Sequence, residues 1–387
     1  MGPNPAAEFE SLRGCLGPTT ARAPLPPLGA WPHLLDQAER HRVIGYVAWR
    51  MLDNHRDALP PSVAVDLDNR LRRATVRNLH HLNQLSDCLR TLRRAGIAAL
   101  PYKGAVLNLV AYPQLGARQA VDLDLLIRPP DVPAALRVLL ANGYQPYEPH
   151  ALARLAGFLR YEIELELRHP GRGIVIDLHW RVAPRWFTVP LDLEPLWGRQ
   201  QPIIYEDRSF PSLARRDHAW LVILHATRHR WRDAVWTLDL AMLLRHATED
   251  DWAHLLAQAT SLHVERLLRI GLRLTTELGW TLPPPAAAFA AAADPAADAL
   301  VAGILHSWTL AETAEVFSWE TLRWHWRTRE RRRDRWALSW RLLFRLTPRD
   351  WNLVRLPRRL AWLYVPLRGL RLAVAYVPRL WRHRKNA

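Results

Sequence analysis

The sequence predicts an α+β fold in which a small mixed β-sheet lies between two helical regions of the chain. Three observations lead to this prediction: helical periodicity runs through residues 31–94, short apolar and alternating segments follow in 97–182, and helical periodicity returns from residue 217. At 387 residues the chain is long enough for several packed units. We expect an N-terminal helical region (1–95), a sheet-containing core (96–215), a helical domain (216–310) and a basic, Arg/Trp-rich C-terminal arm (311–387).

The N-terminal region contains the pattern of a long helix with one buried face. Between residues 71 and 92, apolar side chains recur at steps of three to five: Leu71, Val76, Leu79, Leu82, Leu85 and Leu89. Gly96 interrupts this pattern, and the apolar segment 97–102 is then expected to form a short strand.

Within the core, helices and strands are expected to alternate. Pro129 and Pro130 end one strand, Asp131 can cap the helix that follows, and Gly143 marks its end. Strict alternation and then an apolar run, separated by a Pro-Gly turn, are typical of a hairpin. The expected elements are a helix over 104–111, a strand over 121–127, a helix over 131–142, a hairpin of 161–169 with 173–182, and a second short hairpin within 201–213.

The region after the core is expected to be helical. The pattern predicts helices over 217–230, 234–247 and 250–279. An Ala/Pro-rich spacer with a weak helix is expected over 283–298.

Composition restricts the class of protein. The two cysteines, Cys15 and Cys88, offer neither a disulfide framework nor a metal-ligand cluster, which favours a reducing compartment. The N-terminus lacks the basic and apolar segments of a signal peptide, and no apolar run approaches the ~20 residues of a membrane span. We therefore expect a cytoplasmic protein, with association with the inner face of the membrane left open.

The net charge of +16 lies in the C-terminal arm. Residues 321–387 hold 19 Arg and Lys but three acids, so the rest of the chain is balanced. Arg alternates there with Trp and Leu, a pattern that fits RNA, because Arg contacts phosphates while rings stack on bases. It fits an anionic membrane surface equally well, and a packed C-terminal cap is the third alternative.

Three aspartates are the candidate catalytic and metal-binding residues. Asp122 and Asp124 stand two positions apart on a strand, so their side chains share a face. Carboxylates so close repel each other unless a cation lies between them, and Mg²⁺ prefers oxygen ligands. Asp177 lies in an apolar strand, where an ion without a partner is costly. The first pair alone would also suit a solvated strand edge, whereas the third acid favours a metal site.

Lys103 and Gly104 are the candidate phosphate-binding residues. They stand where a strand ends and a helix begins, and the free N–H groups of a helix N-terminus bind phosphate. Glycine at this place lets a phosphate approach the backbone closely.

The order of these parts resembles a little-characterised bacterial branch of the nucleotidyltransferase superfamily, whose members share the polymerase-beta-type catalytic fold. The resemblance rests on LPYKGAVLNLVAYPQLGARQAVDLDLLIRPPDVPAALRVLLANGY (100–144), IVIDLHWRV (174–182) and LVILHATRHRWRDAVWTLDLAMLL (221–244). In the family's pattern a K-G precedes the aspartate pair and an Arg stands four residues before it; Lys103, Gly104 and Arg118 hold these places. The usual phosphate-binding G-S is here Gly104-Ala105, which leaves this role to backbone amides and Lys103.

The resemblance implies transfer of a nucleoside monophosphate from an NTP, with ATP the first expectation, to an acceptor hydroxyl, with release of pyrophosphate. Asp122, Asp124 and Asp177 would hold two Mg²⁺ ions, for which Mn²⁺ can substitute, while Lys103 and Arg118 neutralise phosphate charge. This mechanism requires Asp177 to face the same cleft as the other aspartates. The acceptor is expected to be a small molecule or a protein; an RNA acceptor held by the arm, and a catalytically inactive nucleotide-binding regulatory module, are the alternatives.

A further set of polar residues combines His225, His229 and Asp239. The histidines stand one helical turn apart, but Ala226 occupies the place of the glutamate in the H-E-x-x-H zinc motif. We expect these residues to contact the base or the acceptor. Core histidines paired with Asp239, and a zinc site, are the alternatives.

Overall fold

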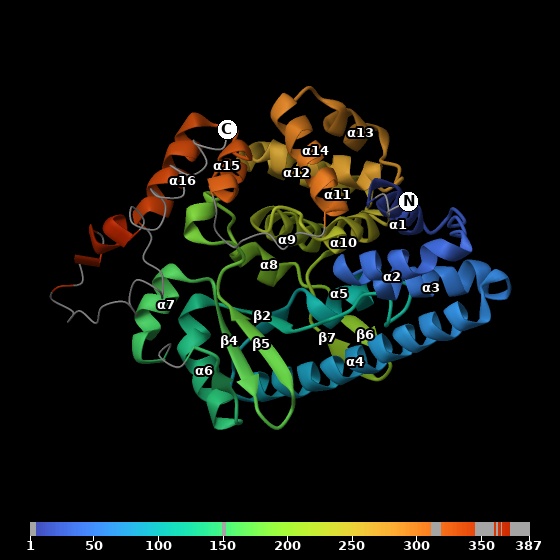
Figure 1. Ribbon diagram of the computed structural model, residues 1–387. Helices are drawn as coiled ribbons and strands as arrows, with labels where there is room; N and C mark the ends of the chain where they lie inside the picture. The colour runs from blue at the N-terminus through green and yellow to red at the C-terminus, as the bar shows by residue number, and fades with distance from the viewer. Residues whose placement is uncertain are drawn as a thin grey trace.

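A five-stranded mixed β-sheet occupies the middle of the structure (Figure 1). The computed structural model describes residues 5–148, 152–310, 319–344, 360, 363–364 and 366–371. The strands are β1 (Ala99–Pro101), β2 (Leu123–Ile127), β3 (Gln145–Pro146), β4 (Glu164–His169) and β5 (Ile174–His179). Their order is β1-β2-β5-β4-β3; β2 and β5 run parallel, and the other neighbours are antiparallel. Helices flank this sheet, so the predicted α+β class is confirmed.

One face of the sheet is covered by the helices that precede and follow β2. These are α4 (Pro61–Arg94), α5 (Gly104–Ala111) and α6 (Val132–Ala141). Four buried leucines of the second half of α4 pack in one cluster with Leu125 of β2 and Leu178 of β5: Leu82, Leu85, Leu89 and Leu92. Because side chains alternate along a strand, Leu125 and Leu178 leave residues 124 and 177 on the opposite face.

The opposite face packs against a larger helical core. Its main helices are α1 (Pro5–Leu16), α2 (Trp31–Arg40), α3 (Ile44–His55), α9 (Arg215–Arg228) and α10 (Ala234–Leu244). Leu126 of β2 meets Leu224 and Leu238 of α9 and α10 in this core, and Figure 1 shows these two helices on the side of the sheet opposite α4. The core reaches from Leu12 to Leu342, so the predicted regions share apolar contacts and their division stays a prediction.

Most expected elements are present with small shifts at their ends. The first hairpin is formed by β4 and β5, and the second by β6 (Ile203–Tyr205) and β7 (Arg208–Phe210). Strand β3, helix α7 (Leu155–Tyr161) and the short helix α8 (Glu194–Gly198) were not expected. Their segments are too short to show a periodic pattern.

The single helix expected over 250–279 is wrong. The chain forms two helices there, α11 (Glu249–Leu262) and α12 (Glu265–Glu277). His263 adopts a left-handed conformation with φ 55°, and the N–H of Val264 bonds back to the carbonyl of Ala259 at 2.9 Å, which ends α11. Two further helices, α13 (Pro284–Ala291) and α14 (Pro295–Thr309), replace the single weak helix expected over 283–298.

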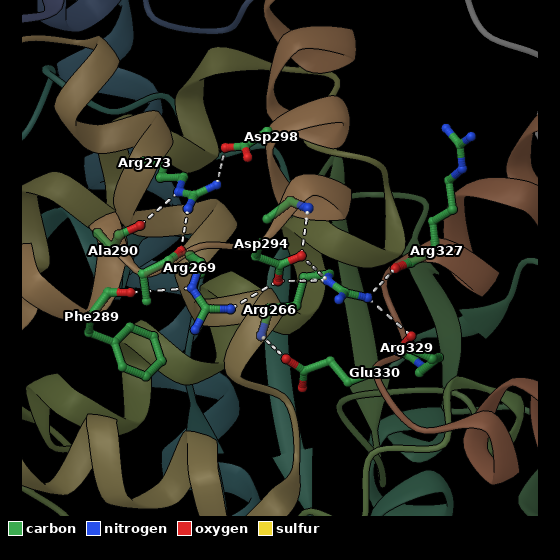
Figure 2. A network of polar contacts seen from close by, with 12 residues as sticks. Arg266, Arg269, Arg273, Phe289, Ala290, Asp294, Asp298, Arg327, Arg329 and Glu330 are labelled. Atoms are coloured by element: carbon green, nitrogen blue, oxygen red, sulfur yellow. Dashed lines mark hydrogen bonds and ion pairs between the residues drawn. The ribbon is translucent and has the colours of Figure 1, made fainter.

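The C-terminal helices α15 (Trp319–Arg327) and α16 (Arg332–Phe344) are tied to the body by a polar network (Figure 2). Arg266 of α12 bonds to Asp294 at 2.8 Å and to the carbonyls of Arg327 and Arg329 at 2.8 and 3.2 Å. Its own backbone N–H bonds to Glu330 at 3.0 Å. Asp294 also accepts from the Ala297 N–H and so caps α14. The network therefore joins α12, α14 and the segment between α15 and α16.

No single helix among the described residues is long and apolar enough to cross a membrane; α13 and α14 reach the required length and composition together, but they meet at a bend of 96°. Much of the predicted basic arm, including residues 345–359 and 372–387, lies outside the described residues.

Candidate active site

All nine residues singled out in the sequence line one cavity of about 260 Å³. On the sheet side they come from the β1–α5 junction, from the loop before β2, from β2 itself and from β5. On the helical side they come from α9, from the residue that follows α9 and from α10. The residues are Lys103, Gly104, Arg118, Asp122, Asp124, Asp177, His225, His229 and Asp239. The structure thus brings the whole predicted set together, including Asp177 on the same side as the other aspartates.

The register of β2 and β5 sets the geometry of the carboxylates. Asp124 is the Cα partner of Asp177 in this parallel pair, so the two side chains stand next to each other on one face. Asp122 precedes the first residue of β2 and lines the same cavity. Three carboxylates therefore converge from two neighbouring strands.

Asp124 is almost fully buried and is held by two cationic or polar partners. Lys103 Nζ lies 2.6 Å from its Oδ1, and His179 Nε2 donates to the same oxygen at 2.9 Å. Burial alone would raise the pKa of Asp124, but Lys103 and His179 outweigh it and hold this pKa well below its usual range. Asp124 is therefore ionised throughout the physiological pH range.

For Asp122 and Asp177, neighbouring positive charges do not outweigh the effect of burial on the pKa. Burial, and then the charges of Asp124 and Asp122, raise the pKa of Asp177 to about 7. The pKa of Asp122 is also raised, first by burial and then by Asp124. Burial is the first cause of both shifts, and the repulsion between the aspartates that adds to it is the part that a bound cation would relieve.

The donor atoms suit a metal ion. One ligand atom each from Asp124, Asp177 and His179 lie within 4.8 Å of one another, and this is the one such group among the residues that the structure describes. Carboxylate oxygens fit Mg²⁺, and an imidazole nitrogen is compatible with Mn²⁺ as well. The residues present therefore fit the divalent ion that the sequence predicted.

His179 and Glu164 were missed in the sequence. They are Cα partners across the β4–β5 pair, and His179 Nδ1 lies 3.1 Å from Glu164 Oε2. Because His179 stands two residues after Asp177 on the same strand, its side chain shares the face of that aspartate. This D-x-H spacing on a predicted strand is the signal that could have found it.

Gly104 is required by the backbone. Its φ is +56°, and a Cβ at this position would lie 2.7 Å from the carbonyl oxygen of Asp122. The N-cap residue Lys103 makes no side-chain capping bond, so the first N–H groups of α5 are not used by a cap. The α5 N-terminus thereby faces the strand that carries the aspartates, as phosphate binding requires.

Arg118 and Asp239 form an ion pair with each other. Arg118 bonds through Nε to Asp239 Oδ1 at 2.7 Å and through Nη2 to Oδ2 at 3.0 Å, and Tyr112 donates to the same carboxylate at 2.6 Å. A third N–H of Arg118 reaches the carbonyl of Gly104 at 3.3 Å. The pair joins the β1–α5 junction to α10, while the phosphate-binding roles of this junction and of Arg118 stay predictions.

His225 and His229 stack near each other, with ring centroids 4.6 Å apart and Trp236 against both. Burial lowers the pKa of His225 well below its usual value and that of His229 to about 3, so both rings are neutral. Among the described residues, the two histidines do not belong to a three-ligand group, and Asp239 accepts hydrogen bonds from Arg118 and Tyr112. The geometry therefore offers no support for the zinc and paired-histidine alternatives.

Three more cationic side chains, which the sequence did not indicate, line the cavity: Arg42, Arg228 and Arg232. Arg228 lies 3.6 Å from Glu164, while Arg42 and Arg232 share Asp233 at 3.8 and 3.2 Å. With Lys103 they place positive charge opposite the aspartates.

Comparison with known proteins agrees with this geometry. The sequence model of a family described as "Uncharacterised nucleotidyltransferase" matches residues 28–279, a span that contains all nine predicted residues together with His179 and Glu164. No curated protein matches the chain.

Proposed function

The chain belongs to this family of uncharacterised nucleotidyltransferases, and on that premise we propose that it transfers a nucleoside monophosphate from an NTP to a hydroxyl group and releases pyrophosphate. The observation that carries the proposal is the parallel pairing of Asp124 with Asp177, which gathers three carboxylates beside the β1–α5 junction. In the reaction the acceptor oxygen bonds to the α-phosphorus, the bond from that phosphorus to pyrophosphate breaks, and the acceptor proton leaves to solvent.

Asp122, Asp124 and Asp177 would hold two Mg²⁺ ions, or Mn²⁺ in their place. Such ions neutralise phosphate charge and make the acceptor hydroxyl more acidic. Lys103 holds Asp124 in its ionised form, and His179 fixes the orientation of the same carboxylate. Asp122 and Asp124 act on the triphosphate side, and Asp177 on the acceptor side.

The cations of the cavity would bind the triphosphate. Lys103 and the free amides of α5 approach from the β1–α5 junction, and Arg42, Arg228 and Arg232 approach from the opposite wall. At about 260 Å³ the cavity is slightly smaller than the ~300–1,000 Å³ of usual ligand pockets. The base is therefore proposed to lie against the neutral rings of His229 and Trp236, which also line the cavity, and ATP is the NTP that we propose.

The acceptor is proposed to be a small molecule or a protein. An RNA acceptor is the second candidate, because residues 321–387 account for the whole net charge of +16. Its exposed Trp336 and Trp340 would serve an anionic membrane surface on the cytoplasmic side as well. Ending the chain after Phe344 removes eleven basic residues and one acid while keeping α15 and α16. Binding to RNA and binding to anionic vesicles, each measured before and after this truncation, show which of the two partners the removed segment serves.

The central experiment incubates the protein and a cell extract with each NTP, labelled at the α-phosphate, in the presence of Mg²⁺. Label should appear on an acceptor, and this transfer should require Mg²⁺ and be lost in Asp124→Asn. Asp207→Asn, which changes an exposed aspartate outside the cavity, should keep the activity. The same reaction with γ-labelled NTP should leave the acceptor unlabelled. Transfer of γ-label, or equal activity of Asp124→Asn and Asp207→Asn, would contradict the proposal.

A further inference from the structure

A second and larger cavity, of about 1150 Å³, opens at the carboxyl ends of β2 and β5. Its walls come from those strand ends, from the segment between β5 and α8, from the end of α11 and from α16. Among the described residues, it shares no lining residue with the cavity of the aspartates. Usual ligand pockets measure ~300–1,000 Å³, so this space is large enough for a ligand of its own.

Aliphatic side chains form much of the cavity wall. They come from two segments of the chain, the stretch between β5 and α8 and the end of α11: Val182, Val189, Leu191, Leu193 and Leu262. Trp340 and Phe344 of α16 add aromatic surface, and Trp340 remains 65% exposed. Such a wall gains free energy when it covers an apolar chain and removes it from water.

A buried hydrogen-bond donor lines the same cavity. Trp186 is 9% exposed, and its indole Nε1 has no hydrogen-bond partner among the described residues. Most buried N–H groups are hydrogen-bonded, because burying one without a partner costs free energy. Because Nε1 itself is closed to solvent, the indole ring must turn toward the cavity before an acceptor oxygen of a bound ligand can satisfy this donor.

Five arginines and three acids among the described residues line the cavity, and two of these acids, Glu194 and Asp334, are paired with Arg128 and Arg333. Arg181, Arg185 and Arg341 line the cavity, and no acidic side chain in the described part of the chain forms an ion pair with them. Arg341 donates to the carbonyl of Arg185 at 2.6 Å, and Arg181 to that of Leu159 at 2.8 Å. Burial and then the charge of Arg185 lower the pKa of Arg181.

From this combination we infer that the cavity binds a single-chain amphiphile with an anionic head, a carboxylate or a phosphate. The acyl chain lies along the aliphatic wall, and the head contacts the three arginines and the Trp186 N–H. The aliphatic part of the wall favours an acyl chain, whereas an oligonucleotide, which would stack on an exposed ring such as Trp340, is an outcome that the test must exclude. The inference is independent of nucleotidyl transfer.

Binding of labelled amphiphiles to the full-length protein, measured by equilibrium dialysis below their micelle concentration, tests the inference. We expect one saturable site, and a Kd that falls by up to about fourfold for each added methylene between decanoate and tetradecanoate. Tetradecanol, which lacks the charge, should bind at least fivefold more weakly than tetradecanoate. Tetradecyl phosphate in parallel identifies which anionic head the site prefers, and either preference supports the inference.

Two pairs of variants locate the site. Arg185→Gln should weaken the binding of tetradecanoate at least fivefold and leave the binding of tetradecanol unchanged. Arg137→Gln, which replaces an exposed arginine on α6, should alter the binding of neither. Trp186→Phe should weaken the binding of tetradecanoate about fivefold. Trp220→Phe, which also removes a buried indole N–H without a partner among the described residues, should leave this binding unchanged. Should Trp186→Phe fail to fold, the surface variant Arg185→Gln decides alone. Affinity independent of chain length, absence of saturable binding, tighter binding of an oligonucleotide, or equal losses in the control variants would overturn the inference.

Discussion

Arg118 and Asp239 lie 121 positions apart in sequence and form a buried two-bond ion pair in the cavity that holds the three candidate catalytic aspartates. One guanidinium thereby joins the loop before β2 to α10, and Tyr112 adds a third bond to the same carboxylate. The pair has a structural role that its position in the family pattern did not reveal.

Removing one partner of this pair should destabilise the protein strongly. Arg118→Ala leaves Asp239 buried without its cation, at a cost of about 3–5 kcal/mol in the free energy of unfolding. Arg72→Ala, in an exposed pair with Asp68, should cost less than about 1 kcal/mol. Urea denaturation measures both values.

The double variant Arg118→Met/Asp239→Leu separates stability from phosphate binding, because it removes both charges and should recover much of the lost stability. If Arg118 also carries phosphate charge, this variant loses affinity for NTP more than for the nucleoside. Equal losses for both ligands would leave Arg118 a packing role alone.

Asp177→Asn should leave NTP binding close to normal and reduce transfer by at least a hundredfold. The change keeps the shape of the side chain but removes the charge on the acceptor side, whereas Asp122 and Asp124 still serve the triphosphate. In EDTA the variant should unfold at a temperature no lower than the parent, because repulsion with Asp124 is relieved. Binding of a fluorescent NTP, transfer of α-label and thermal unfolding are the measurements; a variant with unaltered transfer would remove Asp177 from the mechanism.

Gly104→Ala and Gly96→Ala form a matched pair, because both glycines have positive φ, +56° and +72°. A Cβ at Gly96 meets nothing within 4 Å, so that variant carries only backbone strain of about 1–2 kcal/mol and keeps activity. A Cβ at Gly104 approaches the Asp122 carbonyl at 2.7 Å and must displace either β2 or the start of α5. We expect a larger loss of stability and loss of turnover in Gly104→Ala; equal behaviour of the two variants would contradict this.

The pH dependence of stability should contain a contribution from Glu330, which accepts from the Arg266 N–H in the network of Figure 2. Burial and then a hydrogen bond with Glu265 raise the pKa of Glu330 to about 7 from 4.5. A raised folded-state pKa stabilises the protein most below pH 4.5, and this stabilisation is lost as pH rises through 7. Since Glu330 is partly exposed, we expect a loss on the order of 1 kcal/mol between pH 4.5 and 8.

Glu330→Gln should flatten this part of the stability profile, because glutamine cannot ionise. Urea denaturation of parent and variant at pH 4.5 and pH 8 measures the difference. An equal slope in both proteins would show that other groups govern this pH range.

The sequence predicted the carboxylates through local rules. Alternation placed Asp122 and Asp124 on one face, and an apolar strand around Asp177 indicated that its charge has a function. The parallel register that sets Asp124 beside Asp177 follows from packing between distant segments, which periodicity does not encode. The same limit explains why the Arg118–Asp239 pair was missed. The break at His263 was missed because neither Gly nor Pro marks it.

The position of β5 also bears on how the protein acquires its site during folding. The β4–β5 hairpin closes locally, but contact of β5 with β2 joins segments such as His179 and Asp124 that are 55 positions apart. Contacts with large sequence separation must overcome chain entropy before they contribute energy, and so form slowly. Helices such as α4 can therefore form while the carboxylates are still apart. In a refolding chain, the ability to turn over NTP should return later than helical signal, and a partly folded chain would be unable to consume nucleotide.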